Sequence, residues 1–414
     1  MNKMKATISL VLLSIVFSLP AQNNIQWRGE NRTGIYNERG LLKSWGEKGP
    51  ELLWSYSGLH EGHSSVAIDA DKIYVTGLNG KTGYLYNMNM NDKPFITDGT
   101  PTYVLVTKYG AEWSESYNGP RGTVTIDDGK IYIISGAGFL ICLNQNPHPQ
   151  KIWEKDIQTD FKAKNITWGI AESPLIVNEK IILTPGGKEH NVVALNKNDG
   201  SLIWSCAGEG DLSAYCSPLY VGDQEVPQVV TMTANHILGI DIATGKKLWS
   251  FENKNKHSVH ANTPVYGDNM LLCTSGYGKG SVMLRLTNGG RSVEKVWESS
   301  ELDSRMGGMV KIGNYAYGSG DANRFWFCVD WKTGEIKYKE NSIGVGVTIA
   351  ADDMLYHYSD KGEMALIKVS PEKFELVSKF PITLGTDQHW AHPVIYNGVL
   401  YVRHGSTLMA YKIK

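Results

Sequence analysis

The sequence has few of the residues that would place it in several large protein classes. Its 414 residues include five cysteines, with no adjacent pair, no Cys-x-x-Cys and no Cys/His cluster at zinc spacing. This excludes a disulfide-rich scaffold, a structural zinc module and an attached c-type haem. The 41 basic and 42 acidic residues nearly balance and form no long basic run, so no nucleic-acid partner is expected. No apolar run is long enough to predict a membrane span.

The scarce cysteines leave one question open. Cys142, Cys273 and Cys328 lie in strand-like runs, where a thiol behaves as a small buried apolar side chain. Cys206 and Cys216 flank a loop and could pair in an oxidising compartment. The sequence alone does not decide whether this disulfide forms.

The one marked apolar run stands at the start of the chain. Lys3 and Lys5 precede an apolar core at 8–19, and Ala21 follows a proline at a plausible cleavage point. Residues 1–21 are therefore predicted to be a signal peptide, and the mature protein to be periplasmic or secreted. No cysteine follows the apolar core, so a lipoprotein-type anchor is not indicated.

Turns and short strands are abundant. The stretch 173–204, SPLIVNEKIILTPGGKEHNVVALNKNDGSLIW, contains four short apolar runs separated by breaks. An Asp-Gly pair at 199–200 precedes the fourth run, which is a strong signal for a tight hairpin. The stretch is thus predicted to form one four-stranded antiparallel sheet. Such a sheet cannot bury both faces alone, so its repetition indicates stacked sheets.

The same unit recurs to the end of the chain about every 47 residues, a spacing typical of β-propeller blades. The opening strands of the eight units start at Val66, Val124, Leu175, Leu219, Val265, Val310, Val347 and Val394. The eighth unit stops at Lys414 after three strands, and the missing strand matches Leu52–Tyr56. Pairing the two would close the ring and remove the exposed edges. The prediction is an all-β, eight-bladed β-propeller over 51–414, with seven blades as the alternative if the short seventh unit merges with a neighbour.

Two segments depart from the repeat. Residues 22–50 precede it and are expected to be an irregular segment packed across one face of the domain. The first unit is enlarged over 78–118, either as surface decoration or as a functional loop. Trp204, in the fourth strand of its unit, is expected to pack between blades.

The pattern SPL…KI(I/Y)…G…ALN…DG…LIW, over roughly 50–414, resembles the repeat of pyrroloquinoline-quinone-like (PQQ-like) β-propellers. That superfamily includes the quinoprotein alcohol dehydrogenases and the outer-membrane assembly factor BamB. The resemblance implies an eight-bladed propeller and leaves the activity open, because one fold hosts many functions.

In such a propeller, the loop that enters the innermost strand of each blade faces the central channel. Here those loops are rich in imidazole, guanidinium and aromatic side chains. The candidate catalytic residues are His63, Arg121, Tyr215, His260, Arg305 and His389, and the candidate ligand-binding residues are Trp168, Glu172, Asn262, Trp390 and His392. A funnel with this lining suits a polar, carbohydrate-like small molecule or oligosaccharide. The alternative is that these side chains bind only water and loop backbone.

Three functions remain open. The first is ligand binding, with polysaccharide processing as an extension: β-elimination of a uronic-acid polymer needs a cation, a base and an acid, which Arg121 or Arg305, the histidines and Tyr215 could supply. The second is the quinoprotein alternative, an oxidoreductase with PQQ and calcium. The third is a BamB-like scaffold that binds an envelope protein.

The sequence departs from what the last two functions imply. Quinoprotein dehydrogenases carry adjacent cysteines beside the quinone, which this chain lacks. Glu172 and Asn262 could supply an acid and an amide in the channel, but no spacing motif identifies them as calcium ligands. Trp168 or Trp390 could stack on a flat ring, but either could equally stack on a sugar. A scaffold has little need for a channel full of His and Arg. Three histidine pairs at i, i+3, namely 60/63, 257/260 and 389/392, have chelating spacing but fall in different registers, so no metal site is predicted.

Overall fold

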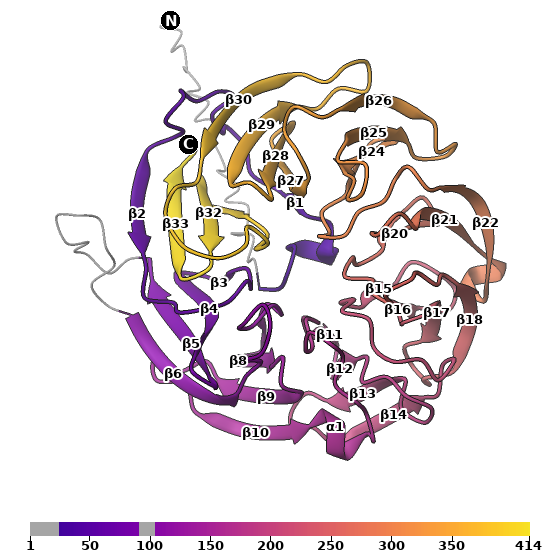
Figure 1. Cartoon of the computed structure of the whole chain (residues 1–414). Helices are drawn as coiled ribbons and strands as arrows, with labels where there is room; N and C mark the ends of the chain where they lie inside the picture. Colours follow the sequence, from indigo (N-terminus) through magenta and orange to yellow (C-terminus); the bar gives the residue numbers. More distant parts are fainter. Residues whose placement is uncertain (1–24, 91–103) are drawn as a thin grey trace, which may run out of the picture.

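The computed structural model describes residues 25–90 and 104–414. These residues form eight separate β-sheets arranged in a ring around a central axis (Figure 1). Regular helix in the described residues is limited to α1 (Ile157–Asp160) and the 3₁₀ turns η1 (Glu30–Arg32) and η2 (Asn288–Gly290). The predicted eight-bladed β-propeller is therefore confirmed, and the seven-bladed alternative is excluded because the seventh unit forms its own sheet.

The first four blades are antiparallel four-stranded meanders whose later strands lie further from the axis (Figure 1). Their strands are β3 (Ala67–Asp69), β4 (Lys72–Asn79), β5 (Thr82–Asn89), β6 (Val104–Ala111); β7 (Thr125–Asp127), β8 (Lys130–Ile134), β9 (Phe139–Asn144), β10 (Lys151–Asp156); β11 (Leu175–Val177), β12 (Lys180–Leu183), β13 (Val192–Asn196), β14 (Leu202–Cys206); β15 (Leu219–Val221), β16 (Gln228–Met232), β17 (His236–Asp241) and β18 (Lys247–Glu252). Each first strand begins within one residue of the position expected from the repeat.

The remaining blades continue the same plan around the ring. Their strands are β19 (Val265–Gly267), β20 (Met270–Ser275), β21 (Gly280–Thr287), β22 (Ser292–Ser299); β23 (Val310–Ile312), β24 (Tyr315–Ser319), β25 (Trp326–Asp330), β26 (Ile336–Glu340); β27 (Gly346–Ala351), β28 (Met354–Ser359), β29 (Glu363–Lys368), β30 (Leu376–Pro381); β31 (Val394–Tyr396), β32 (Val399–His404) and β33 (Thr407–Lys412).

The ring is closed by a strand from the other end of the chain. β2 (Leu52–Tyr56) pairs antiparallel with β33, with Trp54 opposite Ala410 and Tyr56 opposite Leu408. This confirms the predicted closure. Without β2, the backbone N–H and C=O groups along the outer side of β33 would form an open sheet edge.

Ahead of β2, a segment expected to be irregular contributes regular structure. η1 lies on the axis of the ring (Figure 1), and β1 (Ile35–Tyr36) then runs parallel to β27, with Ile35 opposite Ala350. β1 thereby makes the seventh blade five-stranded at its inner edge. The segment thus enters the centre of the ring and joins a blade.

Apolar faces of neighbouring blades pack against each other, which is why the inner strands are buried on both sides. Trp204, on the outer strand of the third blade, is buried with side chains of the fourth, as predicted. Its indole N–H donates to the carbonyl of Ile242, 3.0 Å away. Gly245 adopts a φ of +75°, and a Cβ there would lie 2.7 Å from the Trp204 ring. Trp297 and Gly334 repeat this arrangement between the fifth and sixth blades.

One further question is settled by the described residues. All five cysteines are free and buried, and Cys206 and Cys216 belong to different apolar clusters. The open question of their disulfide is therefore answered by two free thiols.

The described part of the enlarged 78–118 region holds β5, β6 and Trp113. The rest of that region (91–103) and the proposed signal peptide at 1–21 lie outside the described residues. No helix in 25–90 and 104–414 is long and apolar enough to cross a membrane.

Candidate functional site

A cavity of about 230 Å³ opens on the axis of the ring. We call it the funnel. Its lining combines six aromatic rings, two guanidinium groups and two imidazoles with small side chains, and none of the described lining residues is acidic. The lining consists of Trp27, Tyr117, Trp168, Tyr215, Tyr277 and Trp390; Arg121 and Arg305; His63 and His392; and Ser65, Ala171, Ser173, Ser217, Val259, Ala261 and Met306.

Seven of the residues singled out from the sequence lie in this lining. They are His63, Arg121, Tyr215 and Arg305 of the candidate catalytic set, and Trp168, Trp390 and His392 of the candidate ligand-binding set. The other four lie in the same loops but do not line the funnel. They are Glu172, His260, Asn262 and His389.

Alternation along the loops explains this division. Consecutive side chains of an extended segment point to opposite sides. In the third blade, Ala171 and Ser173 line the funnel and Glu172 between them does not. In the fifth blade, Val259 and Ala261 line it and His260 between them does not. Which side chain reaches the funnel therefore depends on its spacing from the strand.

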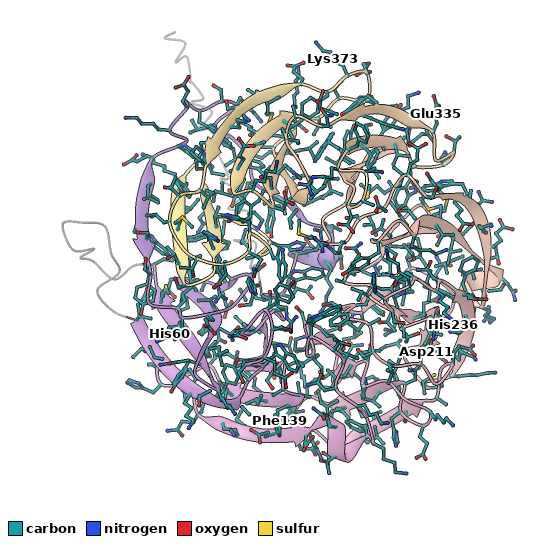
Figure 2. The ribbon with its side chains drawn as sticks, viewed as in Figure 1. His60, Phe139, Asp211, His236, Glu335 and Lys373 are labelled. Carbon is teal, nitrogen blue, oxygen red and sulfur yellow. The ribbon has the colours of Figure 1, made fainter. Side chains whose placement is uncertain are left out.

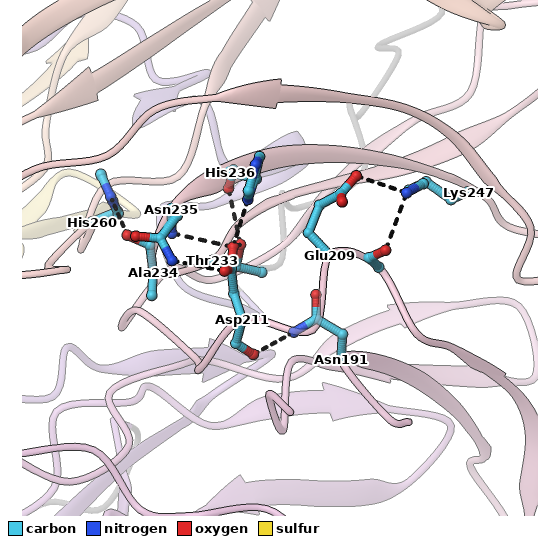
Figure 3. Close-up of polar contacts among 10 residues, drawn as sticks. Asn191, Glu209, Asp211, Thr233, Ala234, Asn235, His236, Lys247 and His260 are labelled. Carbon is cyan, nitrogen blue, oxygen red and sulfur yellow. Dashed lines mark hydrogen bonds and ion pairs between the residues drawn. The ribbon is translucent and has the colours of Figure 1, made fainter. Parts of the chain in front are cut away.

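The residues that point away are held inside the fold. His260 has no exposed surface, and its Nε2 lies 3.3 Å from the carbonyl of Ala234 (Figure 3). That carbonyl belongs to a loop fixed by Asp211, which accepts hydrogen bonds from Asn235 and His236 at 2.7 and 2.8 Å. Figure 2 shows Asp211 and His236 side by side, well away from the axis. His260 is thus positioned to support this loop and has no route to the funnel.

The other three are equally engaged. His389 stacks on His404 with ring centroids 3.8 Å apart, and its Nδ1 lies 2.6 Å from the Tyr358 hydroxyl. The Asn262 side-chain amide donates to Thr274 Oγ1 at 2.7 Å. Glu172 accepts a hydrogen bond from the Thr184 backbone at 3.1 Å. These contacts connect the loops to the blades behind them.

The floor of the funnel comes from the N-terminal segment, which the sequence did not identify as part of the site. We call residues 25–36 the plug. Trp27 lines the cavity, and its ring meets that of His392 edge to face at 4.9 Å. Arg28 donates to the Met309 carbonyl at 2.8 Å and to His392 Nδ1 at 3.3 Å. Through these contacts the plug ties the sixth and eighth blades to the axis.

Arg32 fixes the plug on the opposite side. Its guanidinium donates to the carbonyls of Pro174 and Pro218, at 2.7 and 2.8 Å, and to that of Ser173 at 3.2 Å. These acceptors belong to the third and fourth blades. Both Arg28 and Arg32 are only 3% exposed. The sequence signal was a tryptophan and two arginines, with two glycines at 29 and 34, ahead of the first repeat.

A chain of hydroxyl groups surrounds much of the funnel. We call it the hydroxyl belt; it comprises Ser65, Thr123, Ser173, Ser217 and Thr263, one from each of the first five blades. The backbone N–H of Ser65 donates to Thr123 Oγ1 at 3.1 Å, and that of Thr123 donates to Ser173 Oγ at 2.9 Å. Ser173 N–H donates to Ser217 Oγ at 2.9 Å. Each hydroxyl therefore binds the backbone of a neighbouring blade, which fixes the positions of the lining loops.

The aromatic walls stand in two groups. Trp168 and Tyr215 face each other with centroids 6.0 Å apart, and the Trp168 backbone N–H lies 3.3 Å from the Tyr215 hydroxyl. Trp390 contacts Tyr117 and His63 at centroid distances of 5.2 and 5.0 Å. Rings held in this way offer flat apolar faces on which a ligand in the funnel can stack.

The two arginines of the lining differ in their pairing. Arg305 lies 3.3 Å from an Asp321 carboxylate oxygen and over the ring of Tyr277. Arg121 has Nε and Nη2 buried with no hydrogen-bond partner. Burial lowers the pKa of Arg121 to about 10, against the raising effects of Tyr215 and Glu112, so the guanidinium remains charged at neutral pH.

Glu112 stands behind Arg121 and shapes the wall. Its carboxylate accepts from the Tyr109 hydroxyl at 2.6 Å and from the backbone N–H groups of Trp113 and Gly136 at 2.7 and 2.5 Å. Burial raises the pKa of Glu112, although these hydrogen bonds oppose the shift. The acid therefore fixes the loop that carries Trp113, and three donors already occupy its oxygens.

The imidazoles of the lining are neutral near pH 7. Burial, with Arg403 and Arg121 nearby, lowers the pKa of His63 to about 3. Burial and Arg28 lower the pKa of His392 well below its usual value. Burial also raises the pKa of Tyr215. A general base or acid works best with a pKa near the working pH, so these shifts disfavour proton transfer in the funnel.

Two side chains behind the lining carry oxygen atoms that could act as calcium ligands. Oε1 of Glu172 and Oδ1 of Asn262 are buried without partners. However, burial raises the pKa of Glu172 to about 8, even with Arg32 nearby, so its carboxyl is largely neutral at pH 7. Among residues 25–90 and 104–414, no three His, Cys, Asp or Glu side chains cluster to hold a metal ion. The described residues do not fit the calcium site and adjacent cysteines that quinoprotein dehydrogenases carry.

The shifted Glu172 predicts a pH dependence of stability. A carboxyl whose pKa rises on folding, here from 4.5 to about 8, stabilises the fold at low pH. That contribution is lost as the pH rises through this window. Between about pH 5 and about pH 8, we expect the wild type to lose on the order of 3–4 kcal/mol of unfolding free energy relative to Glu172→Gln, which cannot ionise.

Urea denaturation of both proteins across this range measures the difference. Burial lowers the pKa of His260 to about 4, so this residue has the opposite effect: its contribution to the unfolding free energy is lost as the pH falls. Because both proteins keep His260, its effect cancels in the comparison. Parallel pH profiles for the two proteins would contradict the assignment of Glu172 as a buried, neutral acid.

Comparisons with known proteins agree with this architecture. The chain is 23% identical to an uncharacterised protein of Rickettsia conorii over 247 residues, covering 56% of this chain and 54% of that protein. It is 27% identical to the outer membrane protein assembly factor BamB of Shewanella oneidensis over 136 residues, which is 32% of each chain. The chain thus spans about half the length of the first of these relatives and about a third of the second.

Solved structures share the fold at low sequence identity. BamB from Moraxella catarrhalis aligns with a TM-score of 0.62 at 15% identity, covering 88% of this chain and 100% of that one. A europium-containing methanol dehydrogenase aligns with a TM-score of 0.63 at 13% identity, covering 94% and 91%. These likenesses show the eight-bladed fold alone. A family model described as outer membrane protein assembly factor BamB matches residues 146–374, more than half of the chain, and the chain therefore belongs to that family of PQQ-like propellers.

Proposed function

We propose that this propeller is an envelope protein that binds a carbohydrate-like ligand in its funnel. The observation that carries the proposal is the lining: six aromatic rings surround a cavity whose floor is Trp27. Sugar rings stack on aromatic faces, and their hydroxyls suit the donors and acceptors placed between those faces. The hydroxyl belt and the plug hold these groups in place before any ligand arrives, which lowers the cost of binding.

Binding is favoured over catalysis by the electrostatics of the lining. The imidazoles that would act as bases have strongly lowered pKa values, and the pKa of the Tyr215 hydroxyl is raised. Three candidate groups for acid–base chemistry or ligand contact, Glu172, His260 and His389, do not line the funnel. Polysaccharide processing would therefore fall to a partner enzyme, with this chain as the binding component.

Location in the envelope is supported by two independent observations. The family is described as an outer membrane assembly factor. The first 21 residues have the basic start and apolar core of a signal peptide. We propose export to the periplasm or the exterior, with cleavage near Ala21.

Calorimetric titration with a panel of oligosaccharides tests the proposal. We expect binding by the wild type and at least about tenfold weaker binding by Trp168→Ala or Trp390→Ala, because each change removes a stacking face. Leu202→Ala, on the outer strand β14 where this side chain is 50% exposed, is the matched control and should bind normally. If no sugar binds, or if the tryptophan variants bind as tightly as the wild type, the proposal fails.

The family match favours a second candidate, an envelope scaffold that binds an outer-membrane protein, as the name BamB implies for its relatives. Co-purification from envelope extract of one outer-membrane partner in stoichiometric amount would support it. Recovery of no such partner would contradict it.

The quinoprotein alternative has no matching set of calcium ligands and adjacent cysteines among the described residues. It would return only if added PQQ and calcium gave a bound quinone spectrum and dye reduction.

A further inference from the structure

We propose that the ligand of the funnel is an acidic sugar, of the uronate type, and that Arg121 binds its carboxylate. This inference rests on the proposed function and narrows it to one substrate class. It follows from the pairing of charges around the funnel and requires no catalytic step.

The first observation is an imbalance of charge. The described lining contains two guanidinium groups and no carboxylate. Arg305 already has a partner in Asp321, at 3.3 Å. Arg121 has none: its Nε and Nη2 are buried and make no hydrogen bond. A positive charge with no ion-pair partner among the described residues thus belongs to the lining of the cavity.

The second observation is that the acid near Arg121 makes its hydrogen bonds to other groups. The nearby acid, Glu112, already accepts hydrogen bonds from Tyr109, Trp113 and Gly136. Buried donors without partners are costly to the fold, so the two unpaired nitrogens of Arg121 call for an acceptor that the described residues do not supply. A guanidinium can donate two parallel hydrogen bonds to the two oxygens of a carboxylate, and such paired hydrogen bonds are stronger than those to a hydroxyl.

The third observation is the setting of this charge. Tyr215 is close enough to influence Arg121 and also packs against Trp168. A ligand that reaches Arg121 therefore meets aromatic faces beside it. An anion on a saturated ring satisfies both features, since the ring stacks while its carboxylate pairs. His63 adds no competing positive charge, because its imidazole is neutral at pH 7.

The test compares matched ligands on the intact protein. Calorimetry would use trigalacturonate, its methyl ester and neutral galactotriose. We expect the acid to bind about 10- to 100-fold more tightly than the ester, because the ester cannot form the charge-assisted pair. This comparison varies only the ligand, so it is independent of the folding of any variant. Added salt should weaken binding of the acid more than that of the neutral sugar.

Variants assign the effect to one residue. Arg121→Gln should remove the preference for the acid, and Arg121→Lys should restore part of it, because lysine keeps the charge without the planar fork. Arg285→Gln is the matched control: Arg285 is half exposed and pairs with Glu294 at the outer surface. It should leave the preference unchanged.

The outcomes separate this inference from the proposed function. Equal affinity for acid and ester, or a preference retained in Arg121→Gln, would overturn the inference while leaving carbohydrate binding intact. Absence of binding by all three sugars would overturn both. Binding of inorganic phosphate or of a planar tricarboxylate quinone, without binding of the uronate, would show an anion site that is not for sugars and would also overturn the inference.

Discussion

Deletion of residues 25–58 is expected to leave the protein without a stable folded monomer. The deletion removes β2, so β33 loses its outer partner and becomes an open edge of the eighth blade. It also removes Trp54, which is buried among side chains of the eighth blade. The plug is lost at the same time, and with it the hydrogen bonds of Arg28 and Arg32. We expect a loss of more than about 5 kcal/mol, comparable to the whole stability of many domains.

Two measurements check this result. Denaturant unfolding followed by tryptophan fluorescence gives the stability, and size-exclusion chromatography shows whether the open edge leads to self-association. The control is a chain that begins at residue 25 and keeps β1 and β2. A shorter deletion, 25–50, separates the contribution of the plug from that of β2. If deletion of 25–58 left the unfolding midpoint and the monomeric state unchanged, the ring would not depend on this strand.

The second large effect concerns Arg32. Arg32→Met keeps most of the side-chain volume but removes the donors to the carbonyls of Ser173, Pro174 and Pro218. These oxygens would then lose a buried charged donor, which costs about 1–3 kcal/mol for each acceptor left unsatisfied. We expect the unfolding midpoint in denaturant to fall accordingly and the funnel to lose its fixed floor.

A control for this variant lies in the same segment. Arg39 is exposed and reaches Asp352 only at 3.8 Å, so Arg39→Met should cost less than about 1 kcal/mol. A second readout is ligand binding: Arg32→Met should weaken sugar binding even though Arg32 does not line the funnel, because Trp27 is attached to the same segment. Stability equal to that of the Arg39→Met protein would show that the plug is not held by Arg32.

The fold could be predicted because its signals are local and repeated. The Asp-Gly turn at 199–200 and the apolar runs on either side define a blade without reference to the rest of the chain. The unfinished eighth unit and the isolated strand at 52–56 together required closure of the ring. Trp204 was predicted to lie between blades because it recurs at the same place in several units.

The site was predicted only as far as the loops that build it. The sequence placed Glu172 and His260 in loops that face the channel, and the residues on either side of each of them line the cavity. It did not specify the side of the loop on which each side chain lies. The spacing of two residues was available as a signal: Ser173 and Ala171 alternate with Glu172, as Ala261 and Val259 do with His260. Once the register of each strand is known, the alternation of side chains shows which residues of the preceding loop line the funnel.

The sequence by itself determined the eight blades, their closure and the loops that surround the axis, because strand periodicity and turn residues act over short distances. Only the tertiary structure decided that Trp27 lines the funnel, that Arg28 ties the segment of Trp27 to the blades, and that Arg121 in the lining has no ion-pair partner among the described residues. The acceptors that tie Arg28 and Arg32 to the blades include backbone carbonyls far along the chain, those of Met309 and Pro174, which are 281 and 142 residues away. A carbonyl is the same in every residue, so no sequence pattern marks it as an acceptor.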